Sequence, residues 1–161
     1  MRLFVIALVC CLLPVAWGKG IDVGAKAPPI TTTLLDGSRL DTQGKVVLVH
    51  FWATWCTPCR EEMPVLDAFY RAHRDEGLVV VAISLDNRED LAKVQQAMSG
   101  LSYPAALLEN TQSRGYGRIW RVPLTFLVDR HGVLRRNGLA SSPTLDAAAL
   151  DRDVLPLLRE R

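Results

Sequence analysis

The sequence predicts one α/β domain with a central mixed β-sheet, helices on both faces and an N-terminal β-hairpin. Apolar runs of strand length alternate with segments of helical periodicity through the middle of the chain, which is the pattern of βαβ units. Two further short strands and a closing helix follow them. No repeat, low-complexity tract or linker divides the 161 residues, a length that suits a single domain.

The first eighteen residues have the composition of a secretory signal peptide. Arg2 gives a positive start, and the apolar stretch after it is shorter than the roughly 20 residues of a spanning helix. Ala16 and Gly18 are the small residues that a cleavage site needs. We therefore expect residues 1–18 to be removed, a domain over 19–161 and a periplasmic location. An uncleaved membrane anchor is the alternative.

The domain is expected to open with extended chain and a hairpin. Paired prolines keep 19–29 out of a helix. Strands are predicted over 30–35 and 38–40, because Asp36 and Gly37 between them form a favoured hairpin turn.

A βαβ unit should follow the hairpin. The continuous apolar run over 46–51 is typical of a strand buried on both faces of a parallel sheet. Helical spacing over 57–75 ends at Gly77, a good helix terminator. Its apolar side consists of Met63, Leu66, Phe69 and Tyr70. A second buried strand is expected over 78–85.

The remaining elements are shorter. A helix is expected over 90–98, a short strand over 103–108, and a short helix or irregular segment over 112–120. The last elements are strands over 124–128 and 133–136, joined by a turn, and a helix over 144–158.

Cys56 and Cys59 lie between the buried strand and the helix, separated by Thr57 and Pro58. A Cys-x-x-Cys pair in this place is a dithiol suited to redox exchange. Unpaired N–H groups and the partial positive charge of the helix start favour the thiolate of the first cysteine, which is the form that attacks a disulfide. The uncharged spacer adds no cation, which favours a reductant over a strong oxidant.

The cysteine count also indicates a functional pair. Cys10 and Cys11 would leave with the signal peptide, so the mature chain would hold only Cys56 and Cys59. A disulfide across two residues closes a very small loop and stabilises little by loop entropy. A structural disulfide would more usefully join distant segments.

Two motifs resemble the TlpA/ResA-like branch of the thioredoxin superfamily. They are Phe-Trp-Ala-Thr-Trp-Cys-Thr-Pro-Cys-Arg-Glu-Glu-Met-Pro over 51–64 and Val-Pro-Leu-Thr-Phe-Leu-Val-Asp over 122–129. The resemblance implies a thioredoxin-like fold and thiol–disulfide oxidoreductase activity outside the cytoplasm, with no bound cofactor. It further implies that Cys56 is the exposed nucleophile and Cys59 the buried resolving thiol.

Two titratable residues are candidates for moving protons. Glu62 lies one helical turn after Cys59, and the resemblance implies a proton-transfer role there. Alternatively, Glu62 is a first-turn acid that complements the helix dipole. His50 stands where thioredoxin has a buried acid, so it is either a proton relay or a satisfied core histidine.

The remaining candidates concern substrate binding. Trp55, Thr57 and Pro58 surround the cysteines in sequence and should line the docking surface. The resemblance implies a cis bond before Pro123, which would turn the Val122 backbone toward the dithiol for pairing with an extended peptide. Alternatively, Pro123 is an ordinary proline at the start of a strand.

The expected partners are proteins. The net charge of +2, or +1 without residues 1–18, gives no reason to expect nucleic acid. The resemblance implies a membrane electron donor of the DsbD/CcdA type and cysteine-containing extracytoplasmic clients, such as apocytochrome c or copper-site proteins of cytochrome oxidase. We expect a monomer.

Two other functions remain as alternatives. A copper-delivery or metal-binding protein would use both thiols, but the histidines show no ligand spacing with them. A peroxiredoxin-like peroxidase would place Thr three residues before its reactive cysteine, where this chain has Ala53. Covalent haem attachment would need His rather than Arg60 after Cys59.

Overall fold

The structure is a computed structural model that describes residues 20–141 and 145–160. The expected signal peptide over 1–18 lies outside the described residues, as does Thr144, where the last helix was expected to begin. Within the described ranges, no helix is long and apolar enough to cross a membrane.

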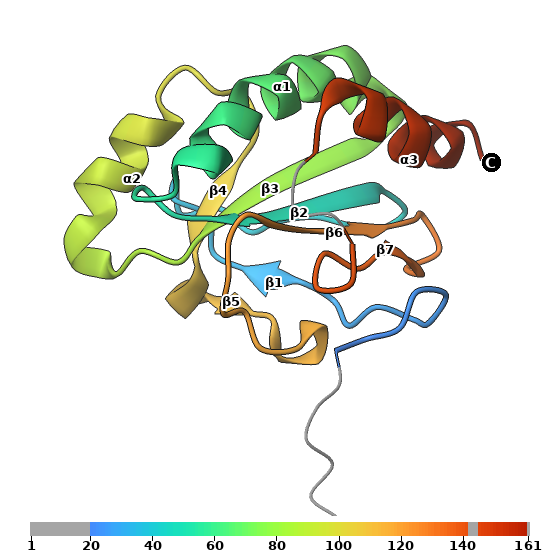
Figure 1. Cartoon of the computed structure of the whole chain (residues 1–161), viewed down its shortest axis with the longest axis horizontal. Helices are drawn as coiled ribbons and strands as arrows, with labels where there is room; N and C mark the ends of the chain where they lie inside the picture. Colours follow the sequence, from blue (N-terminus) through green and yellow to red (C-terminus); the bar gives the residue numbers. More distant parts are fainter. Residues whose placement is uncertain (1–19, 142–144, 161) are drawn as a thin grey trace, which may run out of the picture.

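A five-stranded mixed sheet with the order β4-β3-β2-β6-β7 forms the centre of the molecule (Figure 1). The strands β2, β3 and β4 run parallel, whereas β6 is antiparallel to β2 and β7 is antiparallel to β6. The mixed sheet is as expected. The strands are β2 (Val46–Trp52), β3 (Leu78–Ser84), β4 (Ala105–Leu107), β6 (Leu124–Val128) and β7 (Leu134–Arg136).

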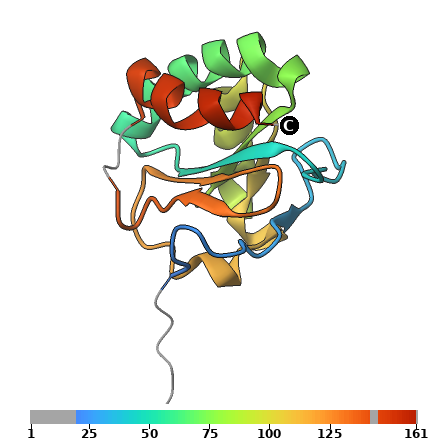
Figure 2. The same ribbon diagram turned by 90° about the vertical axis from the view of Figure 1, so that its right-hand side faces the viewer.

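The three α-helices of the described residues all pack into one hydrophobic cluster. They are α1 (Thr57–His73), α2 (Leu91–Met98) and α3 (Ala147–Arg159). Met63, Val94 and Val154, one from each helix, belong to this cluster. Figure 2 shows α1 and α3 side by side on the same face of the sheet. The crossovers from β2 to β3 and from β3 to β4 step in the same direction across the sheet, and right-handed crossovers then place α1 and α2 on one face.

The opposite face has no α-helix among the described residues, which differs from the expected helices on both faces. A second hydrophobic cluster there receives Ile30 from the N-terminal segment and Tyr116 from a short 3₁₀ helix. The ring of Tyr116 lies 5.0 Å from that of Phe126 on β6. The 3₁₀ helices are η1 (Arg74–Glu76), η2 (Arg88–Asp90), η3 (Leu108–Asn110) and η4 (Arg114–Tyr116).

The expected N-terminal hairpin is present only as a tight turn. Gly37 has a φ of 84°, and one isolated bridge joins Thr33 to Arg39. The strand β1 (Thr31–Thr32) instead pairs antiparallel with β5 (Thr111–Gln112), a partner about eighty positions away in the chain. Sequence pattern reveals a turn, but it does not reveal which distant strand wins the remaining hydrogen bonds.

The βαβ unit that carries the cysteines matches its predicted form closely. Every residue of β2 is buried, as expected of a central parallel strand. The helix α1 begins at Thr57, runs on past Pro64 and is followed by η1, and the chain then turns at Gly77 with a φ of 92°. This unit fixes the end of β2 and the start of α1 relative to each other.

Candidate active site

Cys56 and Cys59 form a disulfide at the start of α1, with an S–S distance of 2.05 Å. Cys56 is the N-cap residue, and its Sγ accepts a hydrogen bond from the Cys59 N–H at 3.3 Å. The first sulfur therefore faces the unpaired amides of the helix start, as the sequence predicted. Thr57 and Pro58, between the cysteines, are both exposed.

The two cysteines differ less in exposure than expected. Cys59 is fully buried, and Cys56 exposes only 5% of its surface. The expected exposed nucleophile is therefore buried in this disulfide form, although it remains the more accessible of the pair.

A buried carboxylate that the sequence analysis missed holds the loop before Cys56. Asp86 accepts hydrogen bonds from the Thr54 N–H at 2.8 Å and the Thr54 hydroxyl at 2.7 Å, and from the Ser84 hydroxyl at 2.6 Å. Burial alone would raise the pKa of Asp86, but these bonds hold it below its usual value. Its position just after β3 was the available signal, because parallel strands bring such residues to the same edge of a sheet.

Glu62 belongs to α1, and its side chain contacts β2 and the segment before α3. It is 6% exposed, and its Oε1 accepts a hydrogen bond from the Leu145 N–H at 3.0 Å. Burial raises the pKa of Glu62 to about 7, against the opposing effects of the Leu145 bond and the Arg136 charge. Glu62 is the sixth residue of α1, and the first turn of that helix holds no acid. The helix-dipole alternative therefore does not describe Glu62.

His50 lies on β2, fully buried. Its Nδ1 is 3.2 Å from the Thr125 hydroxyl and 3.8 Å from Glu62 Oε2. Burial lowers the pKa of His50 to about 4. With these directions of shift, the imidazole of His50 is charged only where Glu62 is protonated, so the two groups do not form an ion pair. Both Nε2 of His50 and Oε2 of Glu62 are buried without a hydrogen-bond partner among the described residues.

The Val122–Pro123 peptide bond is cis. It lies at the same edge of the sheet as the disulfide, because Leu124, at the start of β6, pairs with Phe51 near the end of β2. Pro123 is buried, and Val122 is half-buried and packs against the cluster that contains both cysteines.

Two exposed tryptophans lie close in sequence to the strand ends that meet at this edge. Trp55 exposes 69% of its surface and Trp120 exposes 68%. Trp55 lies four residues after Phe51, and Trp120 lies four residues before Leu124. Phe51 and Leu124 pair with each other, so both tryptophans are a few residues along the chain from the same pair. Trp52 in contrast is fully buried.

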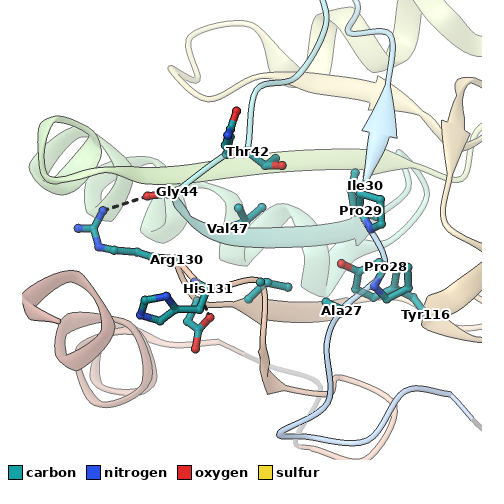
Figure 3. A pocket seen from close by; sticks show the side chains of 14 residues that line it. Ala27, Pro28, Pro29, Ile30, Thr42, Gly44, Val47, Tyr116, Arg130 and His131 are labelled. Carbon is teal, nitrogen blue, oxygen red and sulfur yellow. Dashed lines mark hydrogen bonds between the residues drawn. The ribbon is translucent and has the colours of Figure 1, made fainter. Parts of the chain in front are cut away.

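A separate pocket of about 270 Å³ lies at the opposite end of β2 (Figure 3). Gly44, Val47, Pro29 and Tyr116 line it, and Arg130 at its rim donates to the Gly44 carbonyl at 3.3 Å. No cysteine lines this pocket. Within residues 20–141 and 145–160, no three His, Cys, Asp or Glu side chains gather as a metal-ligand group.

A mixed sheet with a Cys-x-x-Cys disulfide at the start of its first helix, opposite a cis-proline, defines a thioredoxin-like protein with a redox-active pair. The chain belongs to the AhpC/TSA family, whose model matches residues 23–137.

Named relatives agree with this class. The thiol-disulfide oxidoreductase ResA of Bacillus cereus is 31% identical over 115 residues, covering 70% of this chain and 66% of its own length. The thioredoxin-like protein YneN of Bacillus subtilis is 33% identical over 122 residues, covering 72% of this chain and 71% of its own. The chain thus spans just under two thirds of the ResA protein.

Solved structures share the fold. A thiol:disulfide interchange protein of the thioredoxin family from Chlorobium tepidum aligns with a TM-score of 0.72 and 27% identity. The alignment covers 86% of this chain and 99% of that one.

Proposed function

We propose that the protein is an extracytoplasmic thiol–disulfide oxidoreductase that reduces disulfides in client proteins. The observation that carries the proposal is the disulfide between the N-cap residue Cys56 and Cys59, at the first turn of α1. A pair held this way alternates between dithiol and disulfide, because both sulfurs stay within bonding distance while the helix start stabilises a thiolate on Cys56.

The reaction is a two-step exchange. The Cys56 thiolate attacks a client disulfide, which forms a mixed disulfide and releases one client thiolate. The Cys59 thiol loses its proton and attacks Cys56 Sγ, which releases the second client thiolate and forms the Cys56–Cys59 disulfide. Two electrons pass to the client. The high effective concentration of Cys59 favours this second step over escape of the mixed disulfide.

Glu62 is assigned the proton transfer at Cys59. It lies one helical turn from Cys59 on α1 and is buried beneath the helix. A carboxyl group whose pKa is about 7 is divided between acid and base at neutral pH, which suits transfer in both directions. His50, with Nδ1 3.8 Å from Glu62, is assigned the role of relay partner.

The edge around the dithiol is assigned to the client. Trp55, Thr57 and Pro58 are exposed next to Cys56. The Val122 backbone, before cis-Pro123, is assigned the pairing with an extended client segment.

We further propose a periplasmic location and a membrane electron donor of the DsbD/CcdA type. An oxidising compartment removes electrons from thiols continuously, so a reductant there needs a source that recharges it. The signal-peptide character of residues 1–18 supports export. Clients would be extracytoplasmic cysteine proteins, with apocytochrome c and the copper-site proteins of cytochrome oxidase as candidates.

Trapping of mixed disulfides in cells tests the function and identifies the clients together. Cys59→Ala removes the resolving thiol, so clients should remain covalently bound to Cys56 and be identified by mass spectrometry. Cys56→Ala is the matched control and should trap none. Equal trapping by the two variants, or none by Cys59→Ala, would contradict the assigned roles.

A further inference from the structure

The dithiol edge carries most of the exposed large apolar surface of the described residues. Across residues 20–141 and 145–160, three large hydrophobic side chains are exposed, namely Val23, Trp55 and Trp120. Two of the three leave the sheet from paired strand ends beside the disulfide. Exposed tryptophan is typical of binding surfaces, since the ring offers a large contact area with few rotamers to fix.

Trp120 is held in place rather than free. The Arg121 guanidinium lies 5.6 Å from the centre of the Trp120 ring. Its Nη2 donates to the carbonyls of Gly138 and Leu139, both at 2.9 Å. Arg121 therefore connects the ring to the backbone after β7, and a ring fixed before binding costs less to order on binding.

The backbone next to Trp120 has free hydrogen-bonding groups. Trp120, Arg121 and Val122 make no backbone–backbone hydrogen bond within the described ranges. The ladder between β2 and β6 ends at Leu124, so the three residues before cis-Pro123 form an open edge. An extended peptide can pair with such an edge, with its side chains next to the tryptophan.

Charge defines the partner further. Residues 110–128 contain three arginines, Arg114, Arg118 and Arg121, and no Asp or Glu. Arg118, two positions before Trp120, is exposed. Its side chain makes no hydrogen bond or ion pair with the described residues. A cation beside an aromatic ring and an open edge is complementary to a carboxylate near an apolar side chain.

We propose that Trp120 and Arg118 form a recognition loop that, together with Trp55, selects an extended client segment with an apolar residue beside its cysteine and a carboxylate close by. This inference rests on the proposed oxidoreductase function and adds its substrate class. The dithiol performs the exchange, and the loop determines which disulfides are reduced fastest.

Peptide disulfides of defined sequence test the recognition loop. The reference peptide carries Leu next to its cysteine and Asp two positions away. One variant peptide replaces Leu by Ser, and another replaces Asp by Lys. We expect the wild-type protein to prefer the reference over either variant by about tenfold in kcat/KM, the loss typical of one interface anchor.

Protein variants separate the two contacts. Trp120→Ala should remove the preference for Leu, and Arg118→Gln should remove the preference for Asp while keeping that for Leu. Val23→Ala, which alters the third exposed hydrophobic residue, is the matched control and should keep both preferences. All variants should reduce hydroxyethyl disulfide, a small neutral substrate, at the wild-type rate.

The outcomes are distinct. Retention of the Leu preference by Trp120→Ala, or an equal loss on every substrate including hydroxyethyl disulfide, would overturn the recognition loop and leave the oxidoreductase function standing. A wild-type protein that fails to reduce even hydroxyethyl disulfide would overturn the proposed function, and the recognition loop with it.

Discussion

Single residues decide the chemistry of the dithiol. Cys56 caps α1 and keeps 5% of its surface exposed, whereas Cys59 is fully buried. The same bond thus joins two sulfurs with different electrostatic surroundings and different access. This asymmetry supports the proposal that Cys56 attacks the client and Cys59 resolves the mixed disulfide.

In the reduced protein, Cys56 should therefore be alkylated faster than Cys59. The partial positive charge of the helix start favours the thiolate form of Cys56, and only the thiolate reacts with iodoacetamide. Rapid-quench labelling with peptide mass mapping measures both rates, and we expect a difference of at least about tenfold. Faster labelling of Cys59 would reverse the two roles.

Glu62→Gln should slow exchange near neutral pH by about 100-fold, a typical contribution of one positioned acid–base group. In the wild-type protein, burial raises the pKa of Glu62 to about 7. The rate of Cys59 attack should rise with pH through this range as Glu62 becomes a base, and the variant should lose that rise. Stopped-flow tryptophan fluorescence with a model disulfide records the profile, and Glu61→Gln, an exposed neighbour, is the control. An unchanged pH profile would limit Glu62 to a structural role.

At the scale of elements, the site depends on how β2, β6 and α1 meet. The register of β2 against β6 places His50 opposite Thr125 and Phe51 opposite Leu124. The first pairing builds the buried group beneath α1, and the second brings cis-Pro123 to the dithiol edge. Asp86, after β3, fixes the loop between β2 and α1.

Gly138→Ala tests how closely the chain approaches β6. A Cβ at Gly138 would lie 2.5 Å from the Thr125 carbonyl oxygen and 2.7 Å from the Thr125 nitrogen. Because these are backbone atoms of a central strand, we expect a loss of about 3 kcal/mol in the free energy of unfolding. Urea unfolding measures the loss.

Gly100→Ala is the matched control for this substitution. Gly100 has a φ of 85°, and nothing lies within 4 Å of its Cβ position. Only the backbone conformation opposes the alanine, at a cost of about 1 kcal/mol. Equal losses for the two variants would show that the approach to β6 is not tight.

At the scale of the whole molecule, two buried groups give stability opposite dependences on pH. Burial raises the pKa of Glu62 from 4.5 to about 7, so the folded protein binds its proton more tightly and loses stability as pH rises through that interval. Burial lowers the pKa of His50 from 6.5 to about 4, so stability rises with pH between these values. The two effects oppose each other between about pH 4.5 and 6.5.

The difference in stability between oxidised Glu62→Gln and oxidised wild type isolates the Glu62 effect. We expect the variant to gain relative to wild type as pH rises from 4.5 to 7, by up to about 1.4 kcal/mol per pH unit. Urea unfolding at several pH values measures the difference. A difference that is independent of pH would contradict the raised pKa of Glu62.

The whole protein should work as a reductant. The spacer residues Thr57 and Pro58 carry no charge, so neither stabilises the reduced form as a cationic spacer would. We expect a reduction potential closer to that of thioredoxin, about −270 mV, than to that of DsbA, about −120 mV. Equilibration with glutathione buffers measures it.

The state of the dithiol in cells gives an independent check. Acid-trapped thiol labelling should find Cys56 and Cys59 mainly reduced, shifting to the disulfide when the membrane donor is deleted. A strongly oxidising potential together with a largely oxidised pool would make the protein a disulfide-forming enzyme instead.

The sequence by itself determined the central strands, the long helix and the redox pair. Local signals are sufficient for these features: a continuous apolar run over 46–51, helical spacing ended by Gly77, and two cysteines at the boundary between strand and helix. Each depends on neighbours in the chain, which is why its position could be predicted closely.

Only the tertiary structure decided the partners of distant residues. It paired β1 with β5 rather than within a long hairpin, placed α1, α2 and α3 in one cluster, and brought Asp86 to Thr54. It also buried Glu62 beside His50, a contact that no pattern along α1 or β2 reveals. Contacts of this kind depend on the register and direction of strands far apart in the chain, and burial within those contacts sets the pKa values that the proposed chemistry needs.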